Sequence, residues 1–187
     1  MTDKVRVCAK MDVVLVTGTA GGIGREIALK FIRERYFVVG IDRLPATISD
    51  ASYAHHIANV ENAAELPELS DMNVSVLINN AGVQNENDID INLKGTINVT
   101  EKYGVHDGIR SIVNIASASA HTGAEFPEYS ASKGGVLAYT KNVALRVAKY
   151  GATCNSISPG GRGSKLPFLV VCAGTGCSRG GENSGRP

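Results

Sequence analysis

The chain has 187 residues, 43% of them hydrophobic, and a formal net charge of +1 with acidic and basic residues interspersed. This length suits one compact domain, and the mixed charge argues against a nucleic-acid-binding surface or a membrane-surface patch. No apolar run is long enough to cross a bilayer, and the charged amino-terminal stretch lacks the apolar core of a signal peptide. We therefore expect a cytoplasmic protein.

Short runs of branched apolar residues alternate with longer stretches of helical periodicity. In chain order they predict a strand at Val13–Val16, a helix at Gly22–Arg35, a strand at Phe37–Ile41, a weaker strand at Tyr53–Ala58, a short helix at Asn59–Leu69, a strand at Val74–Ile78, a helix at Asp88–Tyr103, a strand at Ser111–Ile115, a helix at Pro127–Tyr150 and a strand at Thr153–Ile157. Regular alternation of this kind predicts an α/β fold, a Rossmann-like doubly wound parallel sheet in a three-layer α/β/α arrangement.

The composition divides the chain into three parts. Residues 1–11 form an amino-terminal extension, residues 12–160 form one Rossmann-like domain, and residues 161–187 form an atypical tail rich in Gly, Ser, Arg and Cys. Leu166–Ala173 interrupts this tail and is a candidate for a short last strand. Beyond Thr175 the composition predicts disorder or a loosely attached tail.

The cysteines and histidines do not form a metal-binding pattern. Cys172 and Cys177 are separated by four residues, which is not a common zinc spacing, and no histidine lies near them. We therefore expect no metal site, and reduced thiols that are mostly buried. The four histidines are expected to be loop or surface residues without an assigned chemical role, with His121, between Ser117 and Tyr129, as the one candidate to line a substrate pocket.

A glycine-rich turn, Thr17–Gly24, joins the first expected strand to the first expected helix. Gly18, Gly22 and Gly24 allow backbone angles that a Cβ forbids, and they let a pyrophosphate approach the main chain. The helix that starts near Gly22 and Ile23 offers unpaired N–H groups to the phosphates. A strand, a turn and a helix in this order predict a dinucleotide-binding site.

An acidic residue, Asp42, follows the second expected strand and lies 18 positions after Gly24. A carboxylate in this place accepts hydrogen bonds from the adenosine ribose hydroxyls and repels a 2′-phosphate. The residue therefore favours NAD(H) as the cofactor, while the neighbouring Arg43 leaves NADP(H) as the alternative.

A tyrosine and a lysine, Tyr129 and Lys133, are spaced so that both side chains lie on one face of the expected helix. An ammonium group about 4–5 Å from a phenol stabilises the phenolate by roughly 3–4 kcal/mol at an effective dielectric of about 20. The pair is therefore a candidate for proton transfer, although such pairs also arise by chance on solvated helices.

Several further motifs, in order, give the chain a specific resemblance. They are the turn Thr17–Gly24, the segment Asn79–Gly82, Asn92 in Ile-Asn-Leu-Lys-Gly, Ser117 at the end of a strand, Tyr129-x3-Lys133 and the turn Pro159-Gly160. Over about Asp12–Gly160 the chain resembles the short-chain dehydrogenase/reductase family. The resemblance implies an NAD(P)-dependent oxidoreductase that transfers hydride between a nicotinamide cofactor and an alcohol or ketone.

The resemblance also assigns roles to individual residues. It implies that Tyr129 exchanges a proton with the substrate oxygen, that Lys133 holds the phenolate and the nicotinamide ribose, and that Ser117 binds the carbonyl. Asn92 would kink its helix and hold a water that connects Lys133 to solvent. The residues implied in cofactor binding are Gly18, Gly22, Ile23, Gly24, Asp42, Asn59, Val60, Asn80, Ala81, Gly82, Tyr129, Lys133, Pro159 and Gly160.

The sequence departs from the family pattern in three places. Only nine residues separate Gly82 from Asn92, the stretch from Asp42 to Asn59 is compressed, and little family sequence follows Gly160. The last departure suggests a shortened or altered carboxyl terminus without the usual substrate lid. This shortened terminus keeps open a second interpretation, a catalytically impaired cofactor-binding or interaction protein. A third interpretation, a sugar-nucleotide epimerase, is the weakest of the three, because those related proteins are generally longer and carry a larger carboxyl-terminal substrate domain. The family packs its subunits through the two longer helices, so the resemblance implies a homodimer formed through Asp88–Tyr103 and Pro127–Tyr150.

Overall fold

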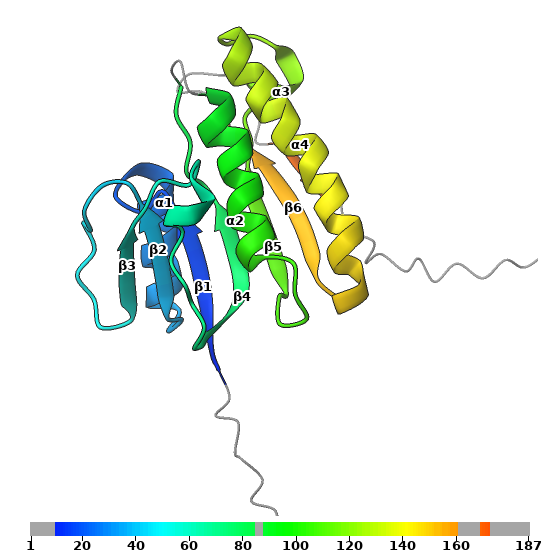
Figure 1. The fold of residues 1–187 in the computed structure, drawn as a ribbon. Coiled ribbons are helices and arrows are strands. Elements are labelled where there is room, and N and C mark those ends of the chain that lie inside the picture. Colours follow the sequence, from blue (N-terminus) through cyan, green and yellow to red (C-terminus); the bar gives the residue numbers. More distant parts are fainter. Residues whose placement is uncertain (1–9, 85–87, 161–168, 173–187) are drawn as a thin grey trace, which may run out of the picture.

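A twisted sheet crosses the whole domain and decides where a ligand can bind (Figure 1). The computed structural model describes residues 10–84 and 88–160, and the backbone of one further strand at residues 169–172. The strands are β1 (Met11–Thr17), β2 (Val38–Asp42), β3 (Tyr53–Ile57), β4 (Met72–Asn79), β5 (Ser111–Ile115), β6 (Thr153–Ser158) and β7 (Leu169–Cys172). Their order is β3-β2-β1-β4-β5-β6-β7, with β7 antiparallel to β6 and the other pairs parallel.

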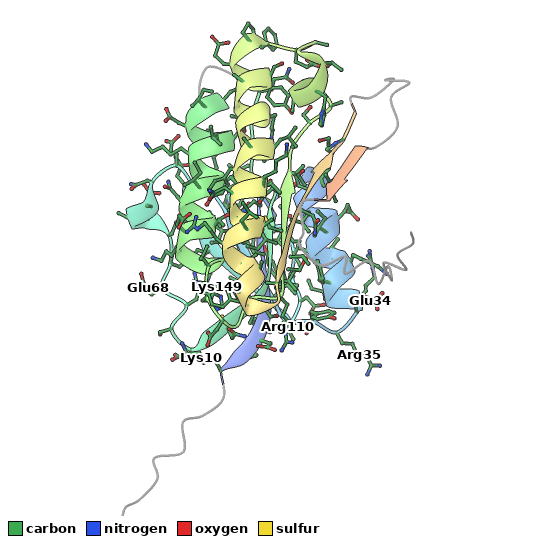
Figure 2. The ribbon with its side chains drawn as sticks, turned by 90° about the vertical axis from the view of Figure 1, so that its right-hand side faces the viewer. Lys10, Glu34, Arg35, Glu68, Arg110 and Lys149 are labelled. Atoms are coloured by element: carbon green, nitrogen blue, oxygen red, sulfur yellow. The ribbon has the colours of Figure 1, made fainter. Side chains whose placement is uncertain are left out.

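Helices cover both faces of this sheet (Figure 2). The helix α1 (Gly22–Arg33) lies on one face, whereas α2 (Gly95–Tyr103) and α4 (Pro127–Val147) lie on the other. The predicted doubly wound, three-layer α/β arrangement is therefore confirmed. The chain leaves β1 toward one edge and returns at β4 toward the other, so a crevice forms between β1 and β4 at their carboxyl ends.

The branched apolar runs of the sequence become the core because the central strands are covered on both faces. Val14, Val16 and Val38 pack with Ala28 on the side of α1. Leu15, Leu77, Ile112 and Val143 belong to the larger cluster on the side of α2 and α4, and all four are buried. Because apolar side chains pack on both faces, the sheet and the helices that carry the polar site residues hold fixed positions relative to each other.

The predicted helix at Asn59–Leu69 is wrong. This stretch contains only a short 3-10 turn, η1 (Ala63–Glu65). The Asn62 side chain accepts a hydrogen bond from the Ala64 N–H, and Glu65 accepts one from the Asn59 N–H. Such side-chain bonds compete with the helical pattern, and Pro67 cannot donate to it.

The predicted helix at Asp88–Tyr103 has the right position but not a uniform conformation. Its first part is a π-helix, η2 (Ile89–Lys94), and only the rest is the α-helix α2. One further element was not predicted, the short helix α3 (Ser119–Thr122). The helix predicted at Pro127–Tyr150 is confirmed as α4, and its last three residues form a 3-10 turn, η3 (Ala148–Tyr150). The weak strand prediction at Tyr53–Ala58 is confirmed as β3.

The last strand, β7, lies within the predicted run Leu166–Ala173 and pairs with β6 at the sheet edge. The predicted disorder beyond Thr175 and the amino-terminal extension before Lys10 lie outside the described residues. Figure 2 labels six charged residues, and these lie toward the end of the sheet where β1 begins: Lys10, Glu34, Arg35, Glu68, Arg110 and Lys149. The opposite end, where the strands finish, carries the cavity described next.

Candidate active site

A cavity of about 590 Å³ lies at the carboxyl ends of the parallel strands. Loops that follow β1, β2, β4, β5 and β6 contribute to its lining, and α4 closes one side. The predicted site residues that line it are Gly18, Gly22, Ile23, Asp42, Asn80, Ala81, Gly82, Ser117, Tyr129, Lys133, Pro159 and Gly160. Residues spread over more than 140 positions of the chain thus meet in one place, as the parallel topology requires.

The glycine-rich turn is held by the segment that follows β4. Gly18 has a φ of 76°, which favours glycine, and the Asn80 amide donates to the carbonyl oxygens of Thr17 and Gly18 at 3.0 and 3.3 Å. The Thr17 hydroxyl in turn accepts hydrogen bonds from the N–H groups of Asn80 and Ala81, both at 3.0 Å. Gly24 does not line the cavity; a Cβ there would collide with the Gly18 carbonyl.

The Asp42 carboxylate is fixed by two backbone N–H groups. Ala20 donates to its Oδ2 at 2.8 Å, and Leu44 donates to its Oδ1 at 2.9 Å. A carboxylate offers about four acceptor positions, so these bonds leave room for two more donors. The side chain therefore stands at the cavity wall, oriented and able to accept further hydrogen bonds.

Asn59 and Val60 lie in a second, smaller cavity that adjoins the first. It has a volume of about 120 Å³ and shares Gly18, Asp42 and Gly82 with the larger cavity. The Asn59 amide donates to Glu61 at 2.8 Å. This smaller cavity beside Asp42 therefore contains Asn59 and Val60, two of the residues implied in cofactor binding.

The side chains of Tyr129 and Lys133 meet at the cavity, one helical turn apart on α4. The Lys133 Nζ lies 5.9 Å from the centre of the Tyr129 ring. Ser117 approaches from the end of β5, and its Oγ accepts hydrogen bonds from the N–H and the hydroxyl of Ser119 at 3.2 and 3.0 Å. Three of the four predicted catalytic side chains therefore line one cavity, although Ser117 comes from a different element than Tyr129 and Lys133.

Lys133 is buried, with 4% of its surface exposed, and its Nζ donates to the Ile115 carbonyl at 2.9 Å. Burial lowers the pKa of Lys133 to about 8, while the negative charge of Asp88 opposes this shift. At neutral pH the ammonium form still prevails, so a positive charge stands beside the phenol of Tyr129.

Asn92 does not line the cavity but lies behind it, fully buried. Its amide donates to the Val83 carbonyl and to the Ser132 hydroxyl at 2.8 and 3.1 Å, and its Oδ1 accepts the Val83 N–H at 2.8 Å. Asn92 therefore ties the loop after β4 to α4, next to Lys133. Its predicted role as a water-holding residue stays a prediction.

A buried cluster of polar side chains joins the strands that end at the cavity to the helices beside them. The Asn79 amide donates to Thr100 and to Asn114, both at 2.8 Å, and the Asn114 amide donates to Thr140 at 2.9 Å. These bonds join the ends of β4 and β5 to α2 and α4. They fix the spacing between the segment that follows β4 and the helix α4, which carries Tyr129.

Sequence reasoning missed two polar residues at the open side of the cavity. Gln84 and Glu125 both line it, and the Gln84 amide donates to the Glu125 carboxylate at 2.9 Å. They lie 41 positions apart, and no motif connects them, so only the folded chain brings them together. The His121 ring contacts the Ser158 hydroxyl at 3.2 Å instead of the cavity.

Neither a metal site nor a membrane-spanning helix is found among the residues that the structure describes. No group of three or more His, Cys, Asp or Glu side chains gathers there in a way that could hold a metal ion. In the same ranges, the helices are too short or too polar to span a membrane. Cys154 is buried and unpaired, whereas Cys8 and Cys177 lie outside the described residues.

The fold and this constellation define a class of protein: a Rossmann-like oxidoreductase with a tyrosine–lysine pair at the carboxyl edge of its sheet. A family model described as short chain dehydrogenase matches residues 12–167. The chain belongs to the short-chain dehydrogenase family. It is thus an enzyme of the class that acts on CH–OH or keto groups with NAD(P).

Individual relatives support the same assignment. The chain is 30% identical over 178 residues to (2S)-((R)-hydroxy(phenyl)methyl)succinyl-CoA dehydrogenase subunit BbsD of Thauera aromatica, over 79% of this chain and 72% of the relative. It is 31% identical over 180 residues to a 3-oxoacyl-acyl-carrier-protein reductase of Staphylococcus epidermidis, over 78% of this chain and 73% of the relative. Among solved structures, aldohexose dehydrogenase of Thermoplasma acidophilum is 29% identical with a TM-score of 0.70, over 81% of this chain and 67% of that one.

Proposed function

We propose that this chain interconverts an alcohol and a ketone with NAD(H), using Tyr129, Lys133 and Ser117. One observation carries the proposal: a single cavity unites the glycine turn, the Asp42 carboxylate and these three side chains. A protein that only bound a nucleotide would not need a proton-transfer group at the far end of the same cavity.

The shape and polarity of the cavity fit a dinucleotide. Gly21 and Gly22 line it, and a Cβ on either would project into open space, so the bare backbone is exposed to the cavity. The amino end of α1 directs unpaired N–H groups there, and no acidic residue occupies its first turn. Asp42 stands at the adenosine end, where it would accept bonds from ribose hydroxyls and repel a 2′-phosphate.

The residues at the other end would perform the proton chemistry. Hydride transfer is what a nicotinamide cofactor supplies when bound. The Tyr129 hydroxyl would give a proton to the carbonyl oxygen or take it from the alcohol. The Lys133 ammonium would stabilise the phenolate, and the Ser117 hydroxyl would stabilise negative charge on the substrate oxygen.

A titration with NADH and NADPH tests cofactor binding. We expect the wild type to prefer NADH, and Asp42→Ala to weaken NADH binding by about tenfold or more, because hydrogen bonds to a charged group are lost. Nicotinamide fluorescence measures both affinities. Asp71→Ala, an exposed carboxylate outside the cavity, is the matched control. Failure of the wild type to bind either nucleotide would rule the proposal out.

Consumption of NADH with a panel of ketones then separates the two functions that the sequence left open. Turnover supports the enzyme. Cofactor binding without turnover on any ketone would favour the alternative, a cofactor-binding or interaction protein with the same fold.

We also propose a homodimer through α2 and α4. The Arg146 guanidinium contacts both carboxylate oxygens of Glu101 at 2.5 and 2.7 Å, so the two helices present one joined outer face. Leu145 on this face is 69% exposed. A dimeric mass by light scattering is expected, and Leu145→Arg should shift it to the monomer, whereas Ile57→Arg at the far sheet edge should not. A monomeric wild type would contradict the dimer.

A cytoplasmic location is also part of the proposed function.

A further inference from the structure

Side chains of β3 join the glycine-rich turn to the connection between β2 and β3 through a chain of hydrogen bonds. The hydroxyl groups of Thr19 and Tyr53 lie 2.8 Å apart. The Tyr53 hydroxyl is 2.7 Å from Nδ1 of His55, and Nε2 of that ring is 2.9 Å from the Leu44 carbonyl oxygen. The chain of hydrogen bonds thus runs from the turn, across β3, to Leu44, two residues after Asp42.

The same residues close into a ring at Asp42. The Leu44 N–H donates to one carboxylate oxygen and the Ala20 N–H donates to the other, and Ala20 follows Thr19 directly. We call the set Thr19, Ala20, Asp42, Leu44, Tyr53 and His55 the Asp42 ring. Both backbone groups that orient the carboxylate are therefore anchored by side chains of β3.

The direction of each hydrogen bond follows from the groups available. A carbonyl oxygen only accepts, so Nε2 of His55 carries the proton that it shares with Leu44. In the neutral ring Nδ1 then accepts, which makes Tyr53 the donor to His55 and Thr19 the donor to Tyr53. Burial raises the pKa of Tyr53, the Thr19 hydrogen bond lowers it and the Asp42 charge raises it further, so the phenol keeps the proton it donates.

Gly40 makes room for this arrangement. A Cβ on Gly40 would collide with the Tyr53 hydroxyl and with the Thr19 Oγ1. Thr19 itself is completely buried. The β2 strand therefore lacks a side chain at the one position where the phenol must reach the glycine-rich turn.

We propose that Tyr53 and His55 are positioning residues that hold the Asp42 carboxylate and so set the preference for a 2′-hydroxyl over a 2′-phosphate on the bound nucleotide. This inference rests on the proposed function. Without the Tyr53 and His55 contacts, Leu44 and Thr19 lose their anchors, and the carboxylate can turn away from the ribose. Bonds to the hydroxyls weaken, and so does the repulsion of a phosphate.

The test compares His55→Phe with His56→Phe in NADH and NADPH titrations. His56 is the neighbouring residue on β3, points to the other face of the strand and is not part of the Asp42 ring. We expect His55→Phe to weaken NADH binding by about tenfold and to leave NADPH binding unchanged or tighter, as hydrogen bonds that orient a charged group are lost. His56→Phe should keep the wild-type ratio of the two affinities.

Tyr53→Phe, which removes a single oxygen, is the second variant in case His55→Phe does not fold. It should lower the NADH preference in the same direction. In the free wild-type protein, nitrogen NMR should show that the neutral form of the His55 ring carries its proton on Nε2. A neutral ring with its proton on Nδ1 would overturn the inference.

The binding results separate two kinds of failure. If the wild type prefers NADH and both ring variants keep that preference, the inference is wrong while the proposed function stands. If the wild type binds neither nucleotide, the proposed function fails and the inference fails with it.

Discussion

Replacing Tyr129 with phenylalanine is expected to lower ketone turnover by about 100- to 10,000-fold, the range in which general acid–base catalysis contributes. The substitution removes one oxygen from a side chain that lines the cavity beside Lys133. The ring remains, so the cavity keeps its shape and NADH binding should be largely retained. Steady-state kinetics and the fluorescence titration measure the two effects separately.

The control for this variant is Tyr36→Phe. Tyr36 is 49% exposed and lies outside the cavity, so its loss of a hydroxyl should leave turnover unchanged. Turnover by Tyr129→Phe within a few-fold of wild type would show that another group transfers the proton. Loss of NADH binding in this variant would instead point to a structural role for the hydroxyl.

Replacing Lys133 with methionine is expected to abolish turnover and yet to stabilise the protein at pH 7. The folded pKa of about 8 lies below the ordinary 10.5, because burial disfavours the ammonium. This difference corresponds to roughly 3 kcal/mol of unfavourable charge burial at neutral pH. Methionine removes that penalty but leaves the Ile115 carbonyl without its donor, at a cost of about 1–2 kcal/mol. The net gain in unfolding free energy is about 1–2 kcal/mol.

The lowered pKa of Lys133 also predicts in which direction the unfolding free energy changes with pH. Between about pH 8 and pH 10.5 the unfolded chain still carries the Lys133 proton that the folded chain has lost. The stability of the wild type therefore rises with pH across this window, relative to the methionine variant. Urea unfolding of both proteins at pH 7 and pH 9.5 should show the advantage of Lys133→Met shrinking. An advantage of equal size at both values would contradict the lowered pKa.

Lys141→Met is the matched control because Lys141 lies on the same helix and is exposed. It should change neither turnover nor the pH dependence of stability. A stabilised but inactive Lys133 variant would mean that the charge is kept for its chemistry and not for the fold.

The strands were predictable because they are short, branched and covered on both faces, which leaves few other structures for such runs. The central strands β1, β4, β5 and β6 all lie where the sequence indicates them. The failed helix at Asn59–Leu69 has a local cause in the hydrogen bonds that the Asn62 and Glu65 side chains make to the backbone. A pattern of apolar positions does not record that competition.

The π-helix at η2 illustrates a different limit. Asn92 places its amide against both backbone groups of Val83, nine positions earlier in the chain. These bonds depend on where the loop after β4 lies, and no periodicity of the sequence encodes that position. The resemblance implied a kink at Asn92, whereas its form, with Asn92 joined to Ser132 of α4, appears only in the folded chain.

The order of the elements, the glycine turn, Asp42 and the Tyr129–Lys133 pair could be predicted from the sequence, because each depends on residues close together in the chain. The pairs of polar groups that meet across elements are visible only in the folded chain: Gln84 with Glu125, and Tyr53 and His55 with Thr19 and Leu44. Contacts between distant segments are fixed by how the strands pair and the helices pack. The two neighbouring histidines of β3 look alike in the sequence, and only the strand pairing turns His55 toward the glycine-rich turn and His56 away from it.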